Sequence, residues 1–81
     1  MRFELFEQVA LAADIPEKRL KRGDLATIVD RHSAKDKEPG YSIEVFNALG
    51  ETIAVTAVPE SALQKLTADE ILHVRSLAQA G

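Results

Sequence analysis

Residues 41–58 read YSIEVFNALGETIAVTAV, and this stretch decides the fold. Apolar side chains alternate with polar or small ones over residues 41–46 and again over 51–58, which is the period-2 pattern of a half-buried strand. Residues 47–50, NALG, are typical of a turn, and Pro59 ends the second run because proline cannot donate to a strand ladder. The stretch therefore predicts two strands joined by a turn.

Each of these two strands has one predominantly apolar side. Ile43 and Val45 share a face of the first strand, and Ile53, Val55 and Ala57 share a face of the second. The opposite faces carry mostly polar or small side chains. Successive side chains of a strand point to opposite sides, so this alternation is that expected of a strand in both runs.

Two further strands are expected upstream. Residues 8–13 form an apolar or small run that stops before Pro16, whose ring restricts the residue preceding it. Residues 25–30, LATIVD, are rich in β-branched side chains, which suit a pleated and half-buried surface. The polar residues 31–40 predict a long hairpin loop between this strand and the next.

The C-terminal quarter has the pattern of helices. Residues 61–66 predict a short helical turn, and the pair Thr67 and Glu70 matches a capping box at the start of a helix over residues 68–80. Its apolar side chains recur at helical spacing. They are Ile71, Val74, Leu77 and Ala78, and Leu72 widens this apolar stripe.

The elements together predict a mostly β protein with a C-terminal helix. The expected architecture is a small SH3-like β-barrel of four to five short antiparallel strands in residues 1–66, followed by an amphipathic helix in residues 67–81. An OB-like barrel and a small α+β sheet are the alternatives. A chain of 81 residues is long enough for one domain of this kind.

Several short segments in fixed order carry a family resemblance. They are LFEQVAL at residues 5–11, DIP at 14–16, LKRGD at 20–24, TIV at 27–29, and the strands of residues 41–58. With these segments the chain resembles the bacterial DUF4926 family, a small stand-alone domain of unknown function, over about residues 5–66. The resemblance implies an SH3-like or KOW-like barrel, similar to that of nitrile hydratase β-subunits. Some members look like partners of a neighbouring small protein, as in toxin–antitoxin pairs.

The resemblance supplies no catalytic motif. It also has two limits: Ala26 stands where the family usually has glycine, and the expected helix lies beyond the similar region. Gly23 and Asp24 have a sufficient structural explanation as a turn into the second strand.

The residue types argue against an enzyme. Cysteine is absent, and the four glycines are isolated, so neither thiol chemistry nor a glycine-rich phosphate loop is predicted. Glu70 and His73 form a single Glu-x-x-His pair, too few ligands for a metal. No catalytic residue, metal or cofactor is expected. The chain has no apolar stretch of membrane-spanning length, so we expect a cytoplasmic protein that does not bind membranes.

The formal net charge of −3 is unevenly distributed. Residues 18–37 have a net charge of +4 and the remainder of the chain has −7. In an SH3-like barrel, the two loops that contain these cations would flank one groove. The predicted partner-binding residues are therefore Lys18, Arg19, Lys21, Arg22, Arg31, Lys35 and Lys37.

The expected helix offers a second surface. Its apolar stripe can pack on the barrel, on a partner protein or on a second copy of the chain. Arg75 lies at the edge of the stripe, where a guanidinium can both pack and donate hydrogen bonds. The predicted interface of this helix consists of Ile71, Val74, Arg75 and Leu77.

These features favour a non-enzymatic protein-interaction module. The expected partner is another protein encoded nearby, in an antitoxin-like or accessory-subunit role, and a homodimer is an alternative partner. A KOW-like nucleic-acid-binding domain is the second hypothesis, because clustered cations attract phosphates. The net acidity and the few aromatic side chains disfavour it. A subunit of an enzyme is a remote third.

Overall fold

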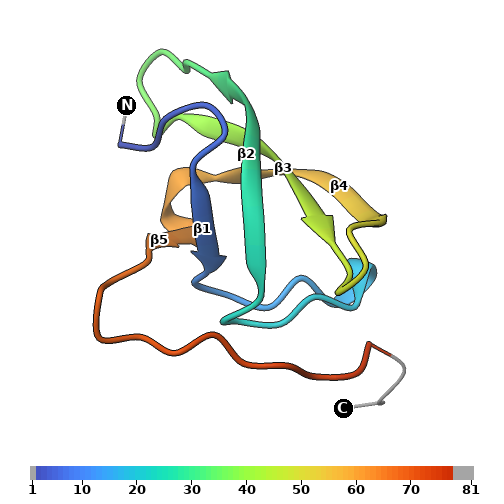
Figure 1. Cartoon of the computed structure of the whole chain (residues 1–81). Helices are drawn as coiled ribbons and strands as arrows, with labels where there is room; N and C mark the ends of the chain where they lie inside the picture. The colour runs from blue at the N-terminus through green and yellow to red at the C-terminus, as the bar shows by residue number, and fades with distance from the viewer. Residues whose placement is uncertain (1, 78–81) are drawn as a thin grey trace.

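The computed structural model describes residues 2–77, which form five strands and two short 3₁₀ helices. The strands make one antiparallel sheet in the order β4-β3-β2-β1-β5, and Figure 1 shows that this sheet is strongly curved. The predicted mostly β class is confirmed. The strands are β1 (Gln8–Leu11), β2 (Leu25–His32), β3 (Gly40–Phe46), β4 (Thr52–Pro59) and β5 (Leu63–Lys65); the 3₁₀ helices are η1 (Pro16–Lys18) and η2 (Glu60–Ala62).

The β3–β4 hairpin forms as the sequence predicts. Its register runs from Gly40 opposite Pro59 to Phe46 opposite Thr52. The turn is closed by the Asn47 side chain, whose Oδ1 accepts hydrogen bonds from two backbone N–H groups of the turn. Gly50 has a φ of 84°, a left-handed conformation that glycine adopts without a steric penalty.

The apolar face of β4 lies on the outside of the sheet. Ile53, Val55 and Ala57 do share one side, but all three are exposed, and Val55 is 54% exposed. A bulge at the turn end of β4 shifts the register between Val45 and Phe46. The core instead takes Val58 from the opposite side of the strand.

The first predicted strand is shorter than expected. β1 ends at Leu11, and the residues after it enter a loop in which Ile15 and Leu20 form an isolated antiparallel bridge around η1. Pro16 begins η1, where its missing N–H has no cost. Leu20 is buried, so the loop adds a side chain to the core.

The core lies on the concave side of the sheet. It combines strand residues with Leu20 from the first loop and Phe3 from the chain ahead of β1. Phe3 and Tyr41 are both fully buried and pack edge to face, with ring centroids 5.4 Å apart. The buried cluster is Phe3, Val9, Leu11, Leu20, Ala26, Ile28, Tyr41, Ile43, Val45, Val58 and Leu63.

The predicted C-terminal helix is wrong for the residues that the structure describes. Residues 68–77 contain a turn and extended chain, and residues 78–80 of the prediction lie outside the described part. The helical turn predicted over residues 61–66 is present only as η2, and the short strand β5 follows it; Leu63 is buried in the core. Ile71, Val74, Arg75 and Leu77 therefore do not form a helical interface.

The capping contact forms without the helix. The Glu70 carboxylate accepts a hydrogen bond from the Thr67 N–H (2.7 Å), as in a capping box, but the Thr67 hydroxyl donates to Asp69 instead of capping an amide. A short isolated helix is marginal in water, and most helical stability in proteins comes from packing of the apolar face. Ile71 and Val74 find no such packing here and are almost fully exposed.

Candidate functional site

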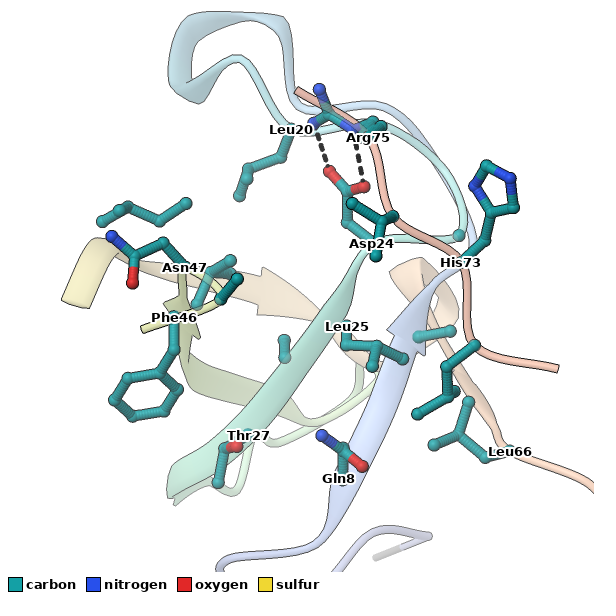
Figure 2. A pocket seen from close by; sticks show the side chains of 18 of the residues that line it. Gln8, Leu20, Asp24, Leu25, Thr27, Phe46, Asn47, Leu66, His73 and Arg75 are labelled. Atoms are coloured by element: carbon teal, nitrogen blue, oxygen red, sulfur yellow. Dashed lines mark hydrogen bonds and ion pairs between the residues drawn. The ribbon is translucent and has the colours of Figure 1, made fainter. Parts of the chain in front are cut away.

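The described chain has a groove of about 800 Å³ between the sheet and the C-terminal segment, which we define as residues 66–77. Gln8, Leu25 and Thr27 from the outer side of β1 and β2 form its floor. Figure 2 shows Phe46 across the groove from the C-terminal segment. The exposed apolar Ile53 adds to the same lining.

Arg75 attaches the C-terminal segment to the first loop (Figure 2). Its Nε and Nη2 donate to the two carboxylate oxygens of Asp24, at 2.8 and 2.6 Å. Nη2 also donates to the carbonyl oxygen of Arg19 at 2.9 Å. Arginine suits this role because its planar guanidinium matches a carboxylate in two parallel hydrogen bonds. We call this contact the Arg75–Asp24 clasp.

The clasp is electrostatically favourable although it is partly buried. Burial of Asp24 acts to raise its pKa, but the hydrogen bonds from Arg75 and from the Lys21 N–H outweigh it and hold the pKa of Asp24 below its ordinary value. The pKa of Arg75 is raised, first because its guanidinium donates to Asp24. The side chains are only 28% and 17% exposed for Arg75 and Asp24, so solvent screens the pair incompletely.

Three apolar side chains of the C-terminal segment are largely exposed. Ile71 is 92% exposed and Val74 is 84% exposed, and Leu72 is also exposed. Exposed apolar side chains are normal when scattered, whereas a contiguous group beside a groove is typical of an interaction site. The segment is thus held in place by Arg75 while Ile71 and Val74 remain almost fully exposed.

The predicted basic residues fall at two separate places. Lys18, Arg19, Lys21 and Arg22 lie in the loop between β1 and β2, beside the groove, and all four are exposed. None of these four forms an ion pair with another residue of the described range. We call them the first-loop cations.

The other three predicted cations lie at the far end of β2. Arg31 is the penultimate residue of β2, and Lys35 and Lys37 follow in the loop to β3. Because β2 has eight residues, its two ends are about 23 Å apart at the rise of an extended strand. Figure 1 also places the two loops at opposite ends of β2, so the structure does not bring the seven cations to one groove.

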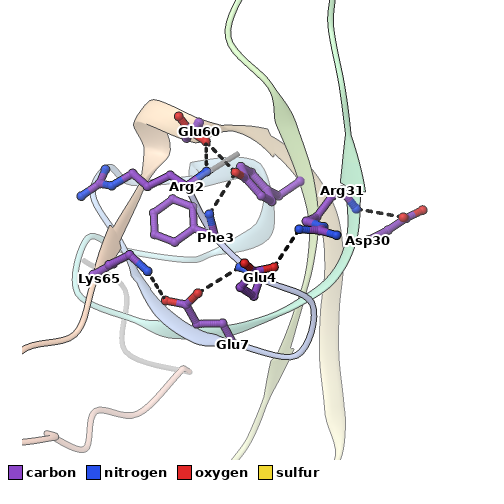
Figure 3. A network of polar contacts seen from close by, with 9 residues as sticks. Arg2, Phe3, Glu4, Glu7, Asp30, Arg31, Glu60 and Lys65 are labelled. Carbon is purple, nitrogen blue, oxygen red and sulfur yellow. Dashed lines mark hydrogen bonds and ion pairs between the residues drawn. The ribbon is translucent and has the colours of Figure 1, made fainter.

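Arg31 takes part in fixing the N-terminus (Figure 3). Its Nη1 donates to Glu4 at 2.8 Å. Glu7 accepts from Lys65 and from the Glu4 N–H, and these contacts, the backbone one first, lower the pKa of Glu7. These interactions hold the residues around Phe3 over the end of the core, so Arg31 has a structural role.

A family model for the Domain of unknown function (DUF4926) matches residues 5–65, more than half of the 81-residue chain. The chain belongs to the DUF4926 family. No curated protein and no solved structure matches this DUF4926 protein. The matched range includes all five strands and ends with β5, so the C-terminal segment lies outside it.

Residues 2–77 contain neither a metal-binding cluster nor a membrane-spanning helix. The range contains no group of three or more histidine, cysteine, aspartate or glutamate residues arranged around a common metal position. Neither of its two helices has the length and apolarity needed to span a bilayer.

Sequence reasoning missed the floor of the groove and the role of Asp24. The sequence pattern places Leu25 and Phe46 in strands without indicating a site, and it explains Asp24 as part of a turn. The role of Asp24 in a turn is confirmed, because its carboxylate accepts a hydrogen bond from the Lys21 N–H at 2.8 Å. Its pairing with Arg75 spans 51 residues, and no local pattern in the sequence signals a contact at that separation.

Proposed function

We propose that this DUF4926 protein is a non-enzymatic protein-interaction module that binds another protein at the groove and the C-terminal segment. One observation carries the proposal: the Arg75–Asp24 clasp holds this segment in place while Ile71 and Val74 stay 92% and 84% exposed. Covering such side chains on binding contributes about 25 cal/mol per Å² of apolar surface removed from water. The first-loop cations beside the groove would attract acidic residues of the partner.

Several features support binding rather than chemistry. The groove is lined largely by apolar side chains, and the carboxylate of Asp24 within it is already paired with Arg75. Glu70 and His73, two other titratable side chains in its lining, are exposed. The sheet order and the 3₁₀ turn before the last strand are consistent with the SH3-like barrel that we propose as the finer description of the fold.

The biological role that fits this surface is that of an antitoxin-like protein or an accessory subunit, acting in the bacterial cytoplasm on a partner encoded nearby. The Arg75–Asp24 clasp orders part of the C-terminal segment before a partner binds. Less conformational entropy is therefore lost on association. The partner would contribute apolar side chains to the groove and acidic ones to its rim.

The test is co-purification of the tagged full-length protein from its native host. We expect one stoichiometric partner with the wild type, its loss in an Ile71→Ser, Val74→Ser double variant, and its retention in Phe6→Ser. Phe6 is a matched control because it is also exposed and apolar but lies at the N-terminal turn. Retention of the partner by the double variant, or no stoichiometric partner at all, would refute the proposed function.

A nucleic-acid-binding role is the second candidate, favoured by the absence of ion pairs among the first-loop cations within residues 2–77. It is weaker because the other predicted cations lie at the opposite end of β2. Binding of this kind weakens steeply with salt, since it depends on counterion release. A Lys21→Glu, Arg22→Glu variant should then lose binding to labelled RNA and DNA at low salt. Equal, negligible binding by wild type and variant would eliminate this candidate.

A further inference from the structure

The two edges of the sheet differ in how they are protected. β5 is three residues long and carries Lys65, and short length and lysine both discourage pairing with another chain. β4 is eight residues long, reads TIAVTAVP and has no charged residue. Within residues 2–77 its only strand partner is β3, so its other side is an open edge.

The direction of the backbone groups on β4 follows from its pairing with β3. Gly40 lies opposite Pro59, and the Glu60 N–H donates to the Pro39 carbonyl at 2.9 Å. A hydrogen bond between these flanking residues makes Gly40 and Pro59 a non-hydrogen-bonded pair. The nitrogen of Pro59, which has no hydrogen to donate, therefore faces the open edge.

Hydrogen-bonding direction alternates along an antiparallel strand, and the register is continuous from Pro59 back to Ala54. Ala57 and Val55 accordingly direct their N–H and C=O groups to the open edge, while Thr56 directs its own toward β3. The side chains of Val55 and Ala57 are exposed, so this edge offers both backbone groups and apolar side chains to another strand.

We propose that the open edge of β4 pairs with β4 of a second copy of this chain, antiparallel about a two-fold axis at Thr56. Val55 then faces Ala57 of the other copy in a hydrogen-bonded pair, and the two-fold axis repeats this pair. The four hydrogen bonds use all the N–H and C=O groups that Val55 and Ala57 direct outward. The two Thr56 residues face each other in a non-hydrogen-bonded pair, where threonines pair favourably.

Charge favours a second copy as the occupant in this register. The paired residues carry no charge, and the acidic residues that flank β4 do not meet. Glu51 precedes β4 beyond the bulge and Glu60 begins η2, so neither acidic residue lies within the paired stretch of either copy. The side-chain sizes also fit, because the large Val55 faces the small Ala57.

The first experiment measures the mass of the purified full-length protein by light scattering and sedimentation from micromolar to millimolar concentration. We expect the wild type to double in mass as concentration rises. Val55→Lys should remain a monomer throughout, because lysine on an open edge prevents pairing. Leu49→Lys is the matched control, since Leu49 is exposed in the β3–β4 turn outside the pairing, and it should dimerise like the wild type. A wild type that stays monomeric at every concentration overturns the proposal.

The second experiment tests the register. The natural chain has no cysteine, so a single substitution gives an unambiguous crosslink. Thr56→Cys places two thiols opposite each other at the roughly 4.5 Å Cα separation of a non-hydrogen-bonded pair, which a disulfide can bridge. It should form a covalent dimer under mild oxidation, whereas Thr52→Cys, with its two thiols about 26 Å apart along the strand, should not. A dimer that crosslinks equally at both positions, or at neither, overturns the pairing.

Both experiments use the purified chain alone and report on β4. They do not require the partner protein of the proposed function, so either proposal can fail without the other.

Discussion

Arg75 and Asp24, 51 residues apart in the chain, are joined by two parallel hydrogen bonds of 2.8 and 2.6 Å. The sequence predicts that the C-terminal residues attach to the sheet through the apolar face of a helix. In the structure they attach through this contact instead. It orders the segment through a single side chain, and it leaves the apolar side chains on either side of Arg75 exposed.

Replacing Arg75 by lysine should release the C-terminal segment. Lysine keeps the positive charge but cannot form the two parallel hydrogen bonds of a guanidinium. We expect faster hydrogen exchange and faster proteolysis within residues 66–77, with the melting temperature nearly unchanged because the segment adds little to the core. Arg22→Lys, at an exposed first-loop cation, should have no effect. Unchanged protection of the segment in Arg75→Lys would show that the clasp does not hold it.

Acid should open the clasp. The pKa of Asp24 is lowered in the folded protein, so the pair stabilises the folded state above the ordinary aspartate value of about 3.9 and this contribution disappears as the pH falls through the lower folded pKa. Carboxyl-carbon NMR of Asp24 should titrate below the ordinary value and in step with loss of protection in the segment. Asp24→Asn should abolish this pH dependence. An Asp24 pKa at or above the ordinary value would contradict the prediction.

Replacing each of two phenylalanines near the N-terminus by alanine should have very different effects on the free energy of unfolding. Phe3 is fully buried against Tyr41, and Phe3→Ala should cost about 3–5 kcal/mol of unfolding free energy, enough to unfold much of so small a domain. Phe6 is exposed, and Phe6→Ala should change stability by no more than about 0.5 kcal/mol. Urea denaturation followed by circular dichroism compares them directly. Similar losses for both would show that the N-terminal residues are not packed as described.

The Tyr41 hydroxyl should contribute measurably to stability. It donates to Glu60 at 2.5 Å and accepts from the Phe3 N–H at 3.3 Å, and burial, followed by the nearby Glu60 carboxylate, raises the pKa of Tyr41. Tyr41→Phe leaves the buried Phe3 N–H without this acceptor, so we expect a loss of about 1–3 kcal/mol in denaturant unfolding. Glu60→Gln keeps an acceptor for the hydroxyl and should cost less. An unfolding free energy unchanged in Tyr41→Phe would exclude this role.

Val74→Asp should leave the isolated protein stable. An amphipathic helix packed on the sheet would not tolerate a carboxylate in its apolar stripe, whereas Val74 is 84% exposed in extended chain. We expect an unchanged melting temperature and a far-ultraviolet spectrum without a helical contribution from residues 68–77. A large drop in melting temperature, with loss of helical signal, would instead support the packed helix.

The sequence by itself determined the β class, the hairpin of residues 41–58 and the turn chemistry around it. These features follow from side-chain alternation and from residues such as Asn47 and Gly50, whose effects act within a few positions. It also excluded thiol chemistry outright, because there is no cysteine. The family was accessible from the sequence too, since ordered short segments carried the resemblance that the family match confirms.

The tertiary structure decided what the patterns left open. Alternation grouped Ile53, Val55 and Ala57 on one face but could not say that this face is outside, since that depends on the curvature of the sheet. Helical spacing over residues 68–80 predicted a helix packed by its apolar face, but the folded chain leaves Ile71 and Val74 exposed and residues 68–77 without a helix. The clasp between Arg75 and Asp24, the burial of Phe3 rather than Phe6, and the separation of the basic loops all depend on contacts between distant residues, which only the folded chain brings together.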